Sequence, residues 1–129
     1  MGLTVDTNVF IAFEKRGGDI DFSTWESSQK VYASVIVVFE LLMGVHRANT
    51  EERKRRRSAF VEAIIAGVGV LDITIAVARV HAEIHADLAA KGQLLIIAAS
   101  ARCHGLAVLT DNVQKFSRAP GLRVIPFRT

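Results

Sequence analysis

Hydrophobic positions follow two patterns along the chain. Short runs of aliphatic and β-branched residues predict buried strands, and longer stretches with apolar residues three or four apart predict amphipathic helices. We predict strands at residues 3–5, 31–33, 70–73, 107–109 and 122–125. We predict helices from Val9 to the Gly17-Gly18 pair, over residues 35–47, 51–66, 75–90 and 95–104, and in two short segments, around Trp25 and ending at Phe116.

Strands therefore alternate with helices throughout, which predicts an α/β fold: a parallel sheet with helices on both faces, in three α/β/α layers. The chain has 129 residues and 50% hydrophobic residues, so we expect one domain spanning residues 1–129. A single cysteine, Cys103, fits a reducing cytoplasm. No apolar run reaches the roughly 18 residues that a membrane span needs, so we expect a cytoplasmic protein with no membrane partner.

Oxygen-bearing side chains follow several of the predicted strands. Because the carboxyl ends of parallel strands meet at one edge of a sheet, ligands bind there, and these side chains are candidate site residues. Glu40 joins them, since it lies early in the helix after the second strand and has apolar neighbours, where a carboxylate needs a compensating partner. The candidates after the strands are Asp6, Thr7, Asn8, Ser34, Thr110, Asp111 and Asn112.

The three acids among these candidates, Asp6, Glu40 and Asp111, can converge at this edge of the sheet. Carboxylates that are packed together take up protons unless a cation lies among them, and oxygen ligands favour Mg²⁺ or Mn²⁺ over zinc. Such a cation activates water and stabilises charge on a phosphodiester, which is the chemistry of a hydrolytic nuclease. The alternative is that Asp6, Ser34 and Asp111 are ordinary helix caps with no catalytic role.

An ordered set of short motifs resembles PIN-domain proteins, and most of all the VapC toxins of bacterial toxin–antitoxin pairs. The resemblance covers essentially the whole chain, and it implies a Mg²⁺- or Mn²⁺-dependent endoribonuclease that is silenced by a VapB-type antitoxin. It also implies a homodimer and a toxin–antitoxin hetero-oligomer. The motifs are Val5-Asp6-Thr7-Asn8-Val9, the segment from Ser34 to Glu40-Leu41-Leu42-Met43-Gly44, Leu95-Ile96-Ile97-Ala98-Ala99, Leu109-Thr110-Asp111-Asn112 with Phe116, and Pro120-Gly121-Leu122-Arg123-Val124.

The motifs that match imply a role for each residue. Asp6, Glu40 and Asp111 correspond to metal ligands, and Asn112 stands at the last acidic position of the family, where many members carry Asn. Thr7, Asn8, Ser34 and Thr110 support these residues. We therefore expect Asp6, Glu40, Asp111 and Asn112 to form the catalytic site.

The chain departs from the family pattern at one place. The family has an Asp three residues before Ile-Ala-Ala, after a loop of the form I-G-x-x, whereas here Leu94 takes that position and runs directly into Leu95. Either five residues of the form I-G-x-x-D are missing from the printed sequence at this point, or the chain lacks the third acid. In the second case the chain is a catalytically silent PIN-fold module that binds RNA or protein.

The most basic stretch of the chain is Arg53-Lys54-Arg55-Arg56-Arg57, in a protein with a net charge of +3. One interpretation is a solvated helix face. The other is that Arg53, Lys54, Arg56 and Arg57 contact RNA phosphates, or an acidic tail of the antitoxin.

Overall fold

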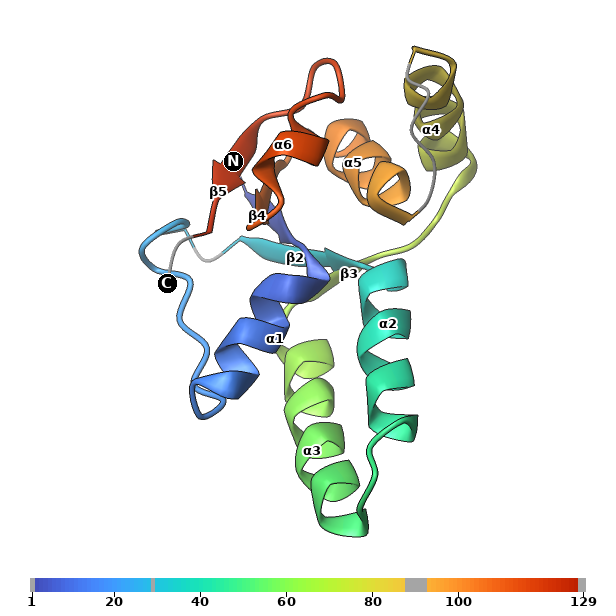
Figure 1. The fold of residues 1–129 in the computed structure, drawn as a ribbon. Helices are drawn as coiled ribbons and strands as arrows, with labels where there is room; N and C mark the ends of the chain where they lie inside the picture. Colours follow the sequence, from blue (N-terminus) through green and yellow to red (C-terminus); the bar gives the residue numbers. More distant parts are fainter. Residues whose placement is uncertain (1, 29, 88–92, 128–129) are drawn as a thin grey trace.

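The computed structural model describes residues 2–28, 30–87 and 93–127, which form a parallel sheet between two layers of helices (Figure 1). The strand order is β3-β2-β1-β4-β5, and every neighbouring pair is parallel. The α/β prediction is therefore confirmed. The strands are β1 (Leu3–Val5), β2 (Val31–Ser34), β3 (Gly69–Leu71), β4 (Ala107–Thr110) and β5 (Val124–Pro126).

The helices divide between the two faces of the sheet because the chain reverses direction after β3. Right-handed crossovers from β1 to β2 to β3 place one set of helices on one face, and the return to β4 and β5 places the other set opposite (Figure 1). The first set is α1 (Thr7–Lys15), α2 (Val35–His46) and α3 (Glu51–Gly67), and the second is α4 (Ile75–Asp87), α5 (Gln93–Cys103) and α6 (Val113–Phe116).

The core lies around β1 and β4, two neighbouring strands in the interior of the sheet. Leu3, Val5, Val108 and Leu109 are fully buried, so neither face of these strands reaches solvent. This explains why both strands have unbroken apolar runs rather than alternating patterns.

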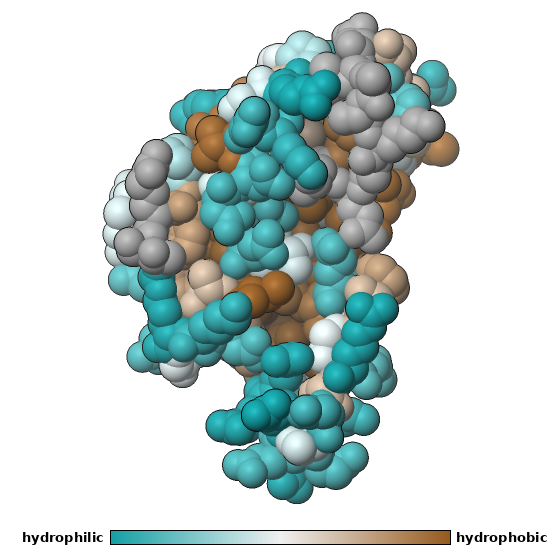
Figure 2. Space-filling view, viewed as in Figure 1, coloured by the Kyte–Doolittle hydropathy of each residue, from teal (hydrophilic) through white to brown (hydrophobic). Residues whose placement is uncertain are grey.

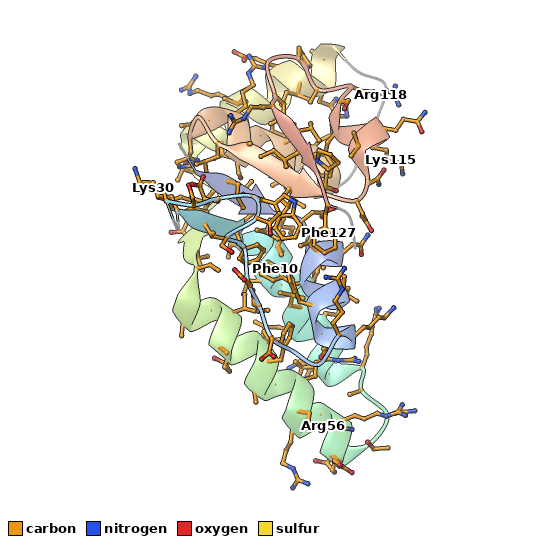
Figure 3. All side chains as sticks on the ribbon, turned by 90° about the vertical axis from the view of Figure 1, so that its left-hand side faces the viewer. Phe10, Lys30, Arg56, Lys115, Arg118 and Phe127 are labelled. Atoms are coloured by element: carbon orange, nitrogen blue, oxygen red, sulfur yellow. The ribbon has the colours of Figure 1, made fainter. Side chains whose placement is uncertain are left out.

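An aromatic cluster on the outer side of α1 attaches the C-terminal end of the chain to the N-terminal third. The ring of Phe127 lies 5.6 Å from Phe13 and 5.2 Å from Trp25 between centroids, and Phe22 meets Phe10 and Phe13 edge-on. Figure 3 labels Phe10 and Phe127, which the cluster connects through Phe22 and Phe13. The cluster therefore holds the segment between α1 and β2 against the helix.

That segment contains the one predicted helix that is wrong. Around Trp25 the described residues form a turn, in which Trp25 N and Glu26 N both donate to Phe22 O, at 2.9 and 2.8 Å. The polar stretch around Trp25 predicted a short helix, but the contacts of the Trp25 ring with Phe13 and Phe127 hold the segment in a turn. Two strands are also displaced: β3 begins earlier than predicted and ends at Leu71, and β5 begins later, at Val124.

The remaining predicted helices agree with the structure to within a few residues. For the predicted helix over residues 75–90, residues 88–90 lie outside the described part of the chain. No helix in the described residues is long and apolar enough to cross a membrane.

Candidate active site

Asp6 lies directly after β1 and caps α1, at the edge of the sheet where the strand order reverses. Its Oδ1 accepts a hydrogen bond from Thr7 N at 2.8 Å, and its Oδ2 accepts one from the Thr110 hydroxyl at 2.8 Å. Its own N–H donates to Leu109 O at 3.0 Å. Asp6 is only 4% exposed, so its carboxylate is fixed in place by donors from both central strand ends.

Thr110 connects Asp6 to the following segment. Its hydroxyl oxygen, which donates to Asp6, also accepts a hydrogen bond from Asn112 N at 2.9 Å. Because Thr110 is completely buried, this hydroxyl has no access to water. One side chain therefore fixes both the carboxylate of Asp6 and the backbone that carries Asp111 and Asn112.

Glu40 is brought to the same place by α2. The helix begins at Val35 because Ser34, at the end of β2, caps it: the Ser34 hydroxyl accepts from Ile36 N at 3.2 Å. Glu40 Oε1 then accepts a hydrogen bond from the Thr7 hydroxyl at 2.7 Å. Thr7 therefore joins the first turn of α1 to the middle of α2 and fixes the second carboxylate.

The electrostatics of the site disfavour the charged form of Asp6. Burial raises the pKa of the Asp6 carboxyl above its usual range, and the nearby carboxylates of Asp111 and Glu40 raise it further. The hydrogen bonds from Thr110 and Thr7 lower the pKa but do not cancel the increase. A cation beside Asp6 would favour the ionised form of its carboxylate.

A hollow of about 350 Å³ opens beside these residues. It is polar where Asp6, Glu40 and Asn112 line it and apolar where Ile97 of α5 closes it. Asp111 is exposed and Ser34 is fully buried, and neither lines the hollow. The full lining is Asp6, Thr7, Asn8, Ile11, Glu40, Met43, Ile97 and Asn112.

The donor set fits a hard cation such as Mg²⁺ or Mn²⁺. Two carboxylates and the Asn112 amide supply only oxygen atoms, and Mg²⁺ is commonly held by one or two carboxylates while it keeps several waters. No group of three or more His, Cys, Asp or Glu side chains in the described residues could hold a metal ion. The side chain of Leu94, the position at which the family pattern has its third acid, lies outside the described residues, as do residues 88–92.

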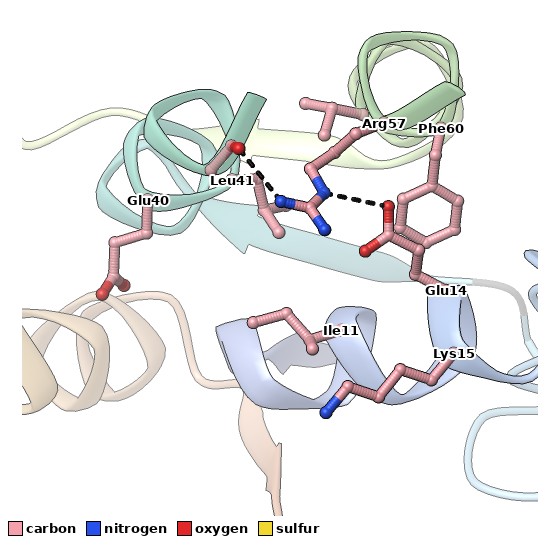
Figure 4. Close-up of a pocket in the computed structure, with 9 residues that line it drawn as sticks. Ile11, Glu14, Lys15, Glu40, Leu41, Arg57 and Phe60 are labelled. Atoms are coloured by element: carbon pink, nitrogen blue, oxygen red, sulfur yellow. Dashed lines mark hydrogen bonds and ion pairs between the residues drawn. The ribbon is translucent and has the colours of Figure 1, made fainter. Parts of the chain in front are cut away.

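A second hollow, of about 240 Å³, continues from the first between α1, α2 and α3 (Figure 4). The two share Ile11 and Glu40. At its far side Arg57 Nε lies 3.4 Å from Glu14 Oε2, and Arg57 Nη1 donates to Gly44 O at 3.1 Å. Arg57, one of the predicted RNA contacts, therefore joins α3 to α1 and α2.

Lys15 also lines this hollow, and the sequence interpretation did not identify it. Its spacing could have indicated its position, because Asn8, Ile11 and Lys15 recur three and four residues apart on one face of α1. Of the other predicted RNA contacts, Lys54 is half-buried and lines neither hollow.

Comparison with known proteins gives consistent matches over the whole chain. Residues 3–122 match the family model of the PIN domain. The chain is 35% identical to Ribonuclease VapC1 of Rickettsia felis, over 97% of this chain and 96% of that protein. It is 32% identical to a tRNA(fMet)-specific endonuclease VapC of Shigella flexneri, over 73% of each. A solved structure of DNA-bound VapBC from Salmonella typhimurium matches with a TM-score of 0.84 and 28% identity, over 98% of both chains.

The alignment with the Rickettsia felis protein also contains a gap in this chain. It spans 130 positions but takes in 97% of a 129-residue chain, so a few positions of the relative have no counterpart here.

Proposed function

Because this chain belongs to the PIN-domain family, and within it to the VapC proteins, we propose that it is a divalent-metal-dependent endoribonuclease and the toxin of a toxin–antitoxin pair. The observation that carries the proposal is the convergence of Asp6 and Glu40 on one hollow, each held by a threonine hydroxyl. A buried carboxylate and a half-buried one, fixed beside each other in this way, destabilise the fold unless a cation compensates them.

In this proposal Asp6 and Glu40 bind Mg²⁺ or Mn²⁺, and the amide oxygen of Asn112 completes the protein's share of the ligands. The bound cation would supply a water nucleophile at neutral pH and neutralise charge on the scissile phosphate. Thr7 donates one hydrogen bond to Glu40 Oε1, and the remaining lone pairs of the carboxylate can bind a ligand or accept a proton from the attacking water. Thr7 and Thr110 are positioning residues, since they act through the two carboxylates.

RNA is the proposed substrate, and hydrolysis by water would leave 5′-phosphate and 3′-hydroxyl ends. The relative from Shigella flexneri is named as an endonuclease specific for tRNA(fMet), so this tRNA is the first substrate to test. The proposed protein partner is a VapB-type antitoxin, because the similar Salmonella typhimurium structure is of a VapBC complex.

One observation favours a second function. Among the described side chains of α5, Ile97 lines the hollow, and the described residues contain no group of three potential metal-binding side chains. A site with only two carboxylates binds a divalent cation more weakly than one with three. The second candidate is therefore a PIN-fold module that binds RNA without cleaving it.

Glu40→Gln tests the proposal. We expect it to lower the cleavage rate about 100-fold or more, because it removes a charged oxygen at the reaction centre. Mn²⁺ titration by calorimetry should show weaker binding, and the melting temperature should change little because Glu40 is only half-buried. Glu62→Gln, at an exposed position of α3, is the matched control and should cleave as the wild type does.

Three outcomes contradict the proposal. Cleavage that continues in EDTA, or products that end in 2′,3′-cyclic phosphate, would exclude metal-assisted hydrolysis. A wild-type protein that binds RNA but does not cleave it at any Mg²⁺ or Mn²⁺ concentration would support the silent module.

A further inference from the structure

A third hollow, of about 420 Å³, lies beyond the second one, on the side away from Asp6. It is a direct continuation of the second one, with which it shares four residues: Glu14, Lys15, Arg57 and Phe60. Arg53 and Arg56 complete its basic wall. The three hollows therefore form one groove that begins at the carboxylates and ends on the first three turns of α3.

Positive charge at this end is uncompensated. The charges of Arg57 and Glu14 cancel in their ion pair, whereas in the described part of the chain no ion pair involves Lys15, Arg53 or Arg56. The side chain of Arg53 donates to a neutral group, Asn49 Oδ1, at 3.1 Å. Figure 2 shows the lower tip of the molecule, where α3 begins, covered by hydrophilic residues.

The geometry suits an extended chain. Arg53, Arg56 and Phe60 recur at helical spacing, so they share the face of α3 that lines the groove. Helix α1 runs along the groove, and eight residues separate Thr7 at the carboxylates from Lys15 at the basic end, a rise of about 12 Å. That length corresponds to a few stacked nucleotides.

We propose that the hollow formed by Lys15, Arg53, Arg56 and Phe60 binds phosphates and a base of the single-stranded RNA beside the cleavage point. This inference rests on the proposed function, and it adds a binding site remote from the reacting phosphate. The cations bind phosphate oxygens, and the half-buried ring of Phe60 offers a stacking surface that accepts any base. Arg57 contacts Glu14 of α1 and Gly44 of α2, and it thereby fixes the distance between α3 and these two helices, which sets the width of the groove.

RNA fits this groove better than an acidic protein segment does. An acidic peptide and RNA both offer anions to the basic residues and to the proposed cation, but only RNA also brings bases that stack on the ring of Phe60. Its phosphodiester chain places a phosphate beside Asp6 and Glu40, where the proposed cation binds. The two ends of the groove therefore both favour phosphate.

The test is RNA binding by the double variant Arg53→Gln/Arg56→Gln in EDTA, where no cleavage occurs. The probe is a short fluorescein-labelled single-stranded RNA, followed by anisotropy at several salt concentrations. We expect the affinity to fall about tenfold, and the slope of log affinity against log salt to decrease by about 0.7 for each phosphate that the variant no longer neutralises. The control, Arg79→Gln/Arg123→Gln, removes the same charge from exposed positions outside the groove and should bind as the wild type does.

The outcomes separate this inference from the proposed function. If the Arg53→Gln/Arg56→Gln variant binds RNA with wild-type affinity and salt slope, the inference is wrong, whether or not the wild type cleaves. If the variant loses only its affinity for the antitoxin, the hollow is a protein site and the inference is also wrong. If RNA binding depends on these arginines but the wild type never cleaves, the RNA site stands and the nuclease does not.

Discussion

At the scale of single residues, two opposing influences act on the charge of the Asp6 carboxyl. As the cap of α1 its carboxylate accepts hydrogen bonds from Thr7 N and the Thr110 hydroxyl, which favour the charged form. Its burial, with Asp111 and Glu40 nearby, favours the neutral form and raises its pKa. The fold therefore holds an acid in place at the expense of stability, as expected where a site is built for a ligand that is not part of the chain.

The first prediction concerns the stability of Asp6→Asn without metal. A pKa raised by folding stabilises the native state below the unfolded pKa, and this stabilisation is lost as the pH rises through the folded pKa. In EDTA at pH 7 we expect Asp6→Asn to have a higher free energy of unfolding than the wild type, because Asn still caps the helix and carries no charge. The difference should shrink as the pH falls. Urea denaturation at a series of pH values measures it.

Asp72→Asn, at an exposed position, is the control for this prediction and should show no such pH dependence relative to the wild type. Added Mn²⁺ should raise the stability of the wild type and leave that of Asp6→Asn unchanged. A stability difference between Asp6→Asn and the wild type that is constant across the pH range would contradict the prediction.

The sequence predicted which residues approach each other better than it predicted their orientation. Asp6, Thr110 and Glu40 were identifiable because each follows a buried strand or interrupts an apolar helix face. Whether Asp111 or Asn112 reaches the hollow depends on how the chain turns after Thr110. That turn is set by the hydrogen bond from Asn112 N to the Thr110 hydroxyl, which spacing alone does not reveal.

At the scale of secondary structure elements, the N-caps determine where each helix begins and therefore which residues face the site. Ser34, Thr50 and Thr74 each accept a hydrogen bond from the first turn of the following helix, and these contacts fix the starts of α2, α3 and α4. The helix predicted around Trp25 failed because ring contacts with Phe13 and Phe127, distant in sequence, outweigh local preference.

Alanine substitutions at two N-caps distinguish a loss of stability from a loss of catalytic activity. Ser34→Ala and Thr50→Ala should each lower the free energy of unfolding by about 1 kcal/mol, the usual effect of losing an N-cap. Only Ser34→Ala should also slow RNA cleavage at saturating substrate, because α2 carries Glu40 and α3 carries no candidate ligand. Denaturation and single-turnover kinetics on both variants give the comparison. Equal activity in the two variants would show that the cap of α2 does not position Glu40.

At the scale of the whole molecule, the site depends on contacts between the two ends of the chain. Asp6 and Thr110 meet because β1 pairs with β4, and Glu40 arrives from the crossover that joins β2 to β3. Alternation of strands and helices predicted a parallel sheet but did not specify its order. The order became clear only with the strand pairing, and it places the acids beside the reversal between β1 and β4.

The same topology leaves apolar side chains exposed at the other edge of the sheet, which is the basis of the last prediction. Edge strand β3 and the residues after it carry Val70, Ile73 and Ile75, which are 38, 47 and 72% exposed. Exposed apolar edges of this kind promote association, so we expect the chain alone to be a homodimer in light scattering. Ile73→Asn/Ile75→Asn should then be a monomer that is still folded, as judged by its circular dichroism spectrum. Co-expression with the antitoxin should give a larger complex with reduced cleavage of RNA. A wild-type monomer that does not bind the antitoxin would contradict both expectations, and a double variant that still dimerises would place the interface elsewhere on the surface.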